Sequence, residues 1–165
     1  MSVLRRTWFP PAFVFVLGLA TISGAWAFQL VGGYVPCKLC LEERWPYYIG
    51  VPLALIALVA VLAEAPAWVK RVALALAVLV FAYGAWLGTY HAGAEWGWWP
   101  GPSDCGAGGA SQATTGADLL KQLNGIRIVS CTEASWRMIG LSFAGWNAVI
   151  ATVLAIVSAV GALRK

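Results

Sequence analysis

Residues 72–91, VALALAVLVFAYGAWLGTYH, form a run of twenty residues without Asp, Glu, Lys or Arg. Because an α-helix rises about 1.5 Å per residue, such a run spans the roughly 30 Å hydrocarbon core of a bilayer. Similar apolar runs cover residues 12–31, 47–63 and 139–163. They lack the alternation of a membrane β-barrel, and backbone polar groups in lipid must be paired within the segment. The sequence therefore predicts an all-α, integral membrane four-helix bundle.

The composition agrees with this fold class. The chain has 165 residues, of which 61% are hydrophobic and 11% are charged, whereas a soluble domain is about 45–50% apolar. We expect one membrane domain over residues 1–165, with the lipid bilayer as its surroundings. The net charge of +4 comes from basic residues scattered at the ends of the spans, without the basic stripe of a nucleic-acid-binding surface.

The N-terminal run also has features of a secretory signal peptide. Arg5 and Arg6 precede it, and Ala25-Trp26-Ala27 resembles a cleavage site. The apolar run continues to residue 31, beyond the roughly 7–15 residues of a signal core. We therefore expect an uncleaved membrane anchor.

The charged residues at the span ends predict the orientation. Six basic residues and one acidic residue lie on the side of the termini, whereas five basic and six acidic residues lie in the loops 32–46 and 92–138. Short basic flanks stay in the cytoplasm. We therefore expect a multi-pass protein of the bacterial inner membrane, with both termini cytoplasmic and both of these loops periplasmic.

The four cysteines fall into these two loops, Cys37 and Cys40 in the first and Cys105 and Cys131 in the second. With four spans, both loops lie on one side, so the two thiol pairs can meet. Cys-x-x-Cys spacing brings two sulfur atoms within disulfide reach and often lowers a thiol pKa. A network of purely structural disulfides is the main alternative, because an extracytoplasmic compartment is oxidising.

Other uses of the cysteines fit the sequence less well. A four-cysteine zinc site would need a second closely spaced pair, which the chain lacks, so no metal is expected. Haem attachment would need histidine directly after Cys40, where Leu41 stands. Four cysteines allow three disulfide connectivities, and the sequence does not choose among them.

Arg44 follows Cys40 by four residues, which on a helical turn would place the guanidinium on the same face as the sulfur. There it would favour a thiolate or a bound anion. The alternative is an interfacial anchor that reaches toward the headgroups. Pro46 disfavours helical angles at Trp45, which suggests that the turn carrying Arg44 is separate from the second span.

The second loop contains a short amphipathic pattern. Leu119, Leu120 and Leu123 alternate with polar residues at helical spacing, which predicts a short helix lying on the membrane surface.

Several motifs together resemble the DsbB family over nearly the whole chain. They are Cys37-x-x-Cys40, Glu43-Arg44, the distant pair Cys105 and Cys131, Gly140-Leu141-Ser142, and Trp146-Asn147. The resemblance implies a quinone-dependent inner-membrane oxidoreductase that reoxidises a periplasmic DsbA-like thiol oxidase. The cofactor would be ubiquinone or menaquinone, which the sequence does not distinguish.

The resemblance also implies roles for individual residues. Cys105 would be attacked by the reduced partner, and Cys131 would first pair with Cys105 and then bridge to Cys37. Cys40 would lie beside the quinone, with Arg44 stabilising negative charge. Glu43 matches the family motif and would have an orienting role. His91 is a candidate from its position alone, because it is the only histidine and closes the third span on the cysteine side, where it could hydrogen-bond a quinone oxygen or supply a proton. The alternative is a polar helix end at the headgroups.

Two other classes of protein remain as alternatives. A membrane scaffold with two structural disulfides would have cysteines that resist mild reductants and trap no partner. A transporter is disfavoured because ionisable residues, which usually line transport pathways, are nearly absent from the spans. Within redox chemistry, a quinone-linked enzyme that works in the reverse direction, as vitamin K epoxide reductases do, is a further possibility.

Overall fold

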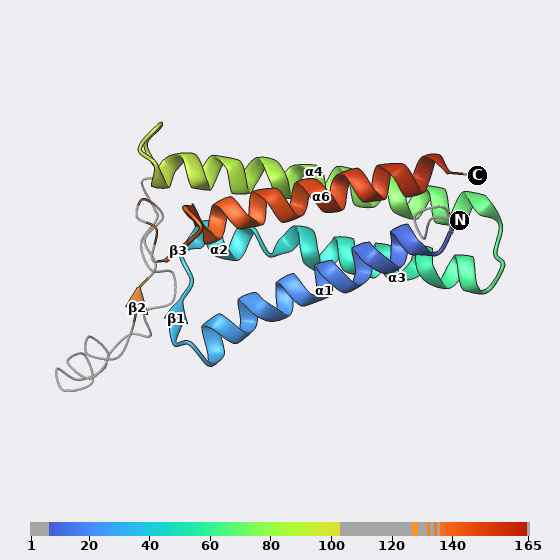
Figure 1. Cartoon of the computed structure of the whole chain (residues 1–165), viewed down its shortest axis with the longest axis horizontal. Coiled ribbons are helices and arrows are strands. Elements are labelled where there is room, and N and C mark those ends of the chain that lie inside the picture. Colours follow the sequence, from blue (N-terminus) through green and yellow to red (C-terminus); the bar gives the residue numbers. More distant parts are fainter. Residues whose placement is uncertain (1–6, 103–126, 129–131, 133, 135, 165) are drawn as a thin grey trace.

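Four long helices run side by side along the length of the molecule (Figure 1). The computed structural model describes residues 7–102, 127, 128, 132, 134 and 136–164. Its long helices are α1 (Phe9–Leu30), α3 (Trp45–Leu62), α4 (Ala67–Glu95) and α6 (Phe143–Leu163). Each is long and apolar enough to cross a membrane. The prediction of an all-α membrane four-helix bundle is therefore confirmed.

The start of α1 and the end of α6 lie at one end of the bundle, and the short elements gather at the other end (Figure 1). These are helix α2 (Lys38–Glu42) and four two-residue strands. Strand β1 (Tyr34–Val35) pairs in parallel with β2 (Arg127–Ile128), so the first loop and part of the second loop are in contact. Cys105, Cys131 and the expected surface helix near residues 119–123 lie outside the described residues.

Helix α4 is longer than the predicted span 72–91, because it begins at Ala67 and ends at Glu95. The expected turn over residues 64–71 was therefore too long. Lys70 is inside the helix and buried, and its Nζ donates a hydrogen bond to the backbone oxygen of Arg164 at 3.1 Å. A lysine stem can lie along apolar surface while its amine meets the carbonyls at the end of a neighbouring helix.

Helix α3 begins at Trp45, with Pro46 in its first turn and Pro52 inside the helix. Trp45 adopts a helical conformation, contrary to the expectation from the following proline. Pro46 itself is tolerated here because the first amide groups of a helix need no intrahelical partner. The turn carrying Arg44 is nevertheless separate, since α2 ends at Glu42 and Arg44 is the N-cap of α3.

The last helix begins at Phe143, four residues later than predicted. Strands β3 (Arg137–Met138) and β4 (Leu141–Ser142) form an antiparallel hairpin instead. Its two turn residues, Ile139 and Gly140, both have positive φ, 54° and 82°, which is the requirement of a type I′ turn. The Ser142 hydroxyl then accepts the Gly145 N–H at 3.2 Å and so caps α6.

The core combines side chains from all four helices, with Val14, Tyr47, Phe81 and Leu154 among its buried members. Helices α4 and α6 make the most extensive contact. At Gly88 a β-carbon would lie 2.9 Å from the backbone nitrogen of Ala148. The absence of a side chain at Gly88 therefore permits the close approach of α4 to α6.

Replacing Gly88 by alanine is expected to destabilise the bundle, because the new methyl group meets backbone atoms of α6 that cannot move aside alone. Overpacking of this kind costs about 1–3 kcal/mol. Gly24→Ala is the matched control, since a β-carbon there meets nothing within 4 Å. Thermal unfolding in detergent should show a lower midpoint for Gly88→Ala and no decrease for Gly24→Ala. Equal midpoints would contradict the close packing at Gly88.

Candidate functional site: a thiol pair beside a membrane chamber

The Cys-x-x-Cys pair lies at the start of α2. Cys37 is the N-cap, and its sulfur accepts the backbone N–H of Cys40 at 3.2 Å. This turn brings the two sulfur atoms to 2.6 Å from each other, and both cysteines are free thiols. Cys37 is fully buried, whereas Cys40 is partly exposed. The pair therefore has the proximity that its spacing predicted, with one sulfur protected and the other accessible.

The surroundings of Cys37 favour its thiolate. Its pKa is lowered from 9.0 to about 5, chiefly because the Cys40 thiol donates a hydrogen bond to it. His91, whose Nε2 lies 3.9 Å from the Cys37 sulfur, lowers the pKa further, while burial opposes both effects. A thiol with this pKa is largely ionised at neutral pH and is therefore a ready nucleophile.

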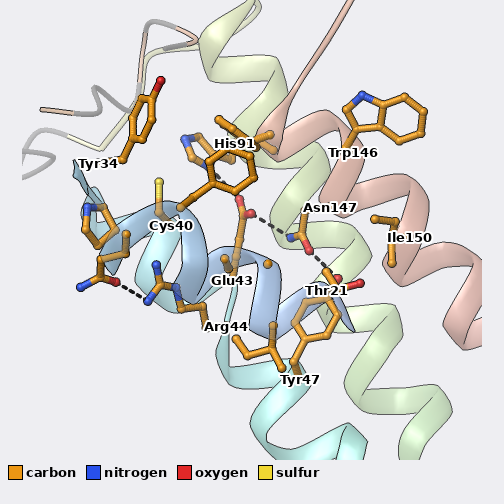
Figure 2. A pocket seen from close by; sticks show the side chains of 18 of the residues that line it. Thr21, Tyr34, Cys40, Glu43, Arg44, Tyr47, His91, Trp146, Asn147 and Ile150 are labelled. Atoms are coloured by element: carbon orange, nitrogen blue, oxygen red, sulfur yellow. Dashed lines mark hydrogen bonds and ion pairs between the residues drawn. The ribbon is translucent and has the colours of Figure 1, made fainter. Parts of the chain in front are cut away.

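Behind the thiols, a chain of buried polar groups connects three helices (Figure 2). Glu43 Oε1 lies 2.6 Å from His91 Nδ1. Glu43 Oε2 accepts the Asn147 amide at 2.8 Å, and Asn147 Oδ1 accepts the Tyr47 hydroxyl at 2.6 Å. Because a carboxylate only accepts, the proton between Glu43 and His91 belongs to Nδ1, and Nε2 faces Cys37.

Arg44 makes its contacts with α1. Its Nη1 donates to Gln29 Oε1 at 2.6 Å, and its guanidinium carbon lies 5.1 Å from the centre of the Trp26 ring. The side chain is buried, with 7% of the residue exposed. Arg44 and Cys40 nevertheless line the same cavity.

This cavity, called here the chamber, has a volume of about 310 Å³ and is lined by residues of α1, α2, α3, α4 and α6. Its apolar wall includes Ile22, Phe28, Phe143 and Ile150. Its polar lining includes Cys40, Glu43, Arg44, His91, Glu95 and Asn147. A mainly apolar cavity with a few convergent polar groups is typical of a small-molecule site.

The structure thus brings together Cys37, Cys40, Glu43, Arg44 and His91 from the residues proposed from the sequence. It adds Tyr47, Glu95, Asn147 and Gln29, which sequence reasoning did not assign to the site. Two signals could have found them. Polar residues inside apolar spans usually have a function, and Glu95 follows His91 by four residues, on the same helical face.

The fold and the site define a class: a multi-pass membrane protein with a reactive thiol pair beside a chamber in its helix bundle. The sequence matches the family "Disulfide bond formation protein DsbB" over residues 5–161. The chain belongs to the DsbB family and is therefore a membrane disulfide-bond formation protein.

A second comparison found a relative that carries no functional description. "Uncharacterized protein RP370" of Rickettsia prowazekii (strain Madrid E) is 24% identical over 132 residues, which cover 79% of this chain and 73% of that protein. No solved structure matches the chain.

The pKa of Cys37 can be measured in the Cys105→Ser/Cys131→Ser variant, which keeps only the first thiol pair. Thiolate absorbance of the reduced protein, with a chelator present, should rise with a midpoint near pH 5. Cys40→Ala in this background removes the largest stabilising contribution and should move the midpoint toward the ordinary thiol value of about 8.5. A first midpoint above pH 8 before this substitution would contradict the geometry.

Proposed function

We propose that this protein is an inner-membrane thiol oxidase that reoxidises a periplasmic DsbA-type dithiol protein and passes two electrons to a membrane quinone. The observation that carries the proposal is the position of Cys40. Its sulfur lines the chamber while lying 2.6 Å from the sulfur of Cys37. A thiol pair so placed can exchange disulfides on one side and reach a lipid-soluble acceptor on the other.

The chamber suits the head group of a quinone. A quinone ring is flat and mainly apolar, with two oxygens that accept hydrogen bonds, and the chamber offers apolar walls with Arg44 as a donor. Its volume of about 310 Å³ is at the lower end for ligand sites, as a single ring requires. A quinone bound there supplies an acceptor for two electrons and two protons.

The residues around the thiols have separate tasks in this proposal. Cys37 and Cys40 lose two electrons and two protons as their disulfide forms. His91 Nε2, facing the Cys37 sulfur at 3.9 Å, accepts the proton that the Cys37 thiol loses when its thiolate forms. Glu43 orients the imidazole through Nδ1 and stabilises the imidazolium. Arg44 provides positive charge where negative charge develops in the chamber.

The contact between the two loops supports exchange between the thiol pairs. Val35 pairs with Ile128, and these residues precede Cys37 by two positions and Cys131 by three. We therefore assign Cys131 to the bridge with Cys37 and Cys105 to the attack by the partner. Each exchange proceeds by a thiolate attacking a disulfide, so every disulfide that is reduced oxidises one dithiol.

The direction of electron flow follows from potentials. A DsbA-type protein, at about −120 mV, is itself a strong oxidant, so only a stronger acceptor can reoxidise it. A quinone meets this requirement without a metal. The charge distribution of the loops supports cytoplasmic termini and periplasmic cysteines.

The proposal is tested by adding ubiquinone or menaquinone analogues to the reduced protein in detergent. We expect two thiols to be oxidised for each quinone reduced. Thiol titration measures the first quantity and quinone absorbance the second. Cys40→Ala should abolish this reaction. Cys105→Ser/Cys131→Ser should retain it yet lose oxidation of an added dithiol protein. A scaffold with structural disulfides would reduce neither quinone.

The partner step has its own test. Cys131→Ala leaves Cys105 as a thiol without its pairing cysteine, so Cys105 should attack the disulfide of an oxidised thioredoxin-like oxidase, and the mixed disulfide should accumulate. Non-reducing gels and mass spectrometry would identify the adduct. Cys105→Ala is the matched control and should form none. Absence of an adduct from both variants would contradict the assigned roles.

A further inference from the structure

The thiol pair and His91 have an arrangement that the disulfide reaction does not require. The two sulfur atoms and a ring nitrogen of His91 all lie within 4.8 Å of one another. They come from two elements, α4 and the start of α2, which pack together through Cys37, Leu39 and Leu87. Sequence spacing pointed away from a metal because a second cysteine pair was missing, but His91 from a distant helix provides a third ligand.

The distance between Cys37 and His91 is close to that of tetrahedral coordination, whereas the two sulfur atoms lie closer together than a metal would hold them. Zinc–sulfur bonds of about 2.3 Å and zinc–nitrogen or zinc–oxygen bonds of about 2.0–2.2 Å place neighbouring ligand atoms about 3.4–3.8 Å apart. The Cys37 sulfur is 3.9 Å from His91 Nε2, and Glu95 Oε1 is 4.0 Å from the same nitrogen. The two sulfur atoms, at 2.6 Å, would separate by rotation of the partly exposed Cys40 side chain.

Glu95 gives an independent indication of a missing ligand. Its side chain is 5% exposed, and Oε2 has no hydrogen-bond partner among the described residues. The Ser142 hydroxyl is a hydrogen-bonding neighbour of this carboxylate, so one of its oxygens is still left unsatisfied. A buried carboxylate oxygen of this kind is costly, and a cation beside His91 would satisfy it.

Glu43 supplies the carboxylate that usually accompanies a metal-binding histidine. Metal-binding histidines usually donate their second ring N–H to a carboxylate, which fixes the ring and raises its basicity. His91 Nδ1 meets Glu43 Oε1 at 2.6 Å while Nε2 faces the sulfur. The ring is thus already oriented as a ligand.

We propose that the reduced protein binds one thiophilic divalent cation, represented by zinc, through Cys37, Cys40 and His91, with the Glu95 carboxylate beside the histidine. Binding replaces the two thiol protons by the metal and leaves the oxidation states of sulfur and metal unchanged. While zinc is bound, the two thiolates cannot form a disulfide, so zinc inhibits oxidation of the thiol pair reversibly. The inference extends beyond the proposed function, because it requires free thiols and neither quinone nor a partner.

Zinc binding is measured on the full-length Cys105→Ser/Cys131→Ser variant in detergent, by competition with a chromophoric chelator. The reduced variant should bind one equivalent, and the same protein with Cys37 and Cys40 joined in a disulfide should bind none. This redox comparison needs no further substitution, so misfolding cannot explain the result. Cobalt should give thiolate-to-metal charge-transfer absorbance in the reduced protein alone. Equal zinc binding by both forms would overturn the proposal.

Two Glu→Gln substitutions, which keep the size of the side chain and remove its charge, test the site. Glu43→Gln should weaken zinc binding by about 10–100-fold, as loss of a carboxylate behind a metal-binding histidine does, and Glu95→Gln should also weaken it. Glu64→Gln, in the turn at the other end of the bundle, should leave the affinity unchanged. If all three variants bind alike, this coordination is wrong. Quinone reduction in metal-free buffer is measured separately, so failure of zinc binding and failure of the proposed function can be distinguished.

Discussion

The contact between Glu43 and His91 is the interaction on which the arrangement of the site depends. Both residues are almost completely buried, and their closest atoms are 2.6 Å apart. A buried carboxylate is costly unless charge or hydrogen bonds satisfy it, and Glu43 is satisfied from two helices, by His91 of α4 and Asn147 of α6. This contact therefore fixes where the end of α2 lies, and with it the Cys37–Cys40 pair.

The rest of the bundle makes that contact possible. Gly88 allows α4 and α6 to approach closely, which brings His91 and Asn147 to the same carboxylate. Arg44, one residue after Glu43, is held by Gln29 and Trp26 of α1. The two consecutive charged residues thus face different helices, and the chamber lies between them with the Cys40 sulfur in its wall.

The sequence was sufficient for the features set by length and spacing. Apolar runs long enough to cross a bilayer predicted four helices, and the Cys-x-x-Cys spacing predicted a close thiol pair. The sequence did not predict the ends of the helices correctly, because tertiary contacts determine where each helix begins and ends. Lys70 lies within α4 because the backbone at the end of α6 accepts a hydrogen bond from its amine. Residues 139–142 do not belong to the last helix because Ile139 and Gly140 form a tight turn. The partners of Glu43 and Arg44 are distant in sequence, so no local pattern could reveal them.

The central claim is that Glu43 acts on the thiol pair through His91, and a double-mutant cycle tests it most directly. The rate of thiol oxidation by quinone would be compared for Glu43→Gln, His91→Asn, the double variant and the parent protein, with unfolding midpoints measured in parallel. If the two residues act as a unit, the double variant will be no slower than the slower single variant. If the two losses multiply, Glu43 and His91 act independently and this account of the site is wrong.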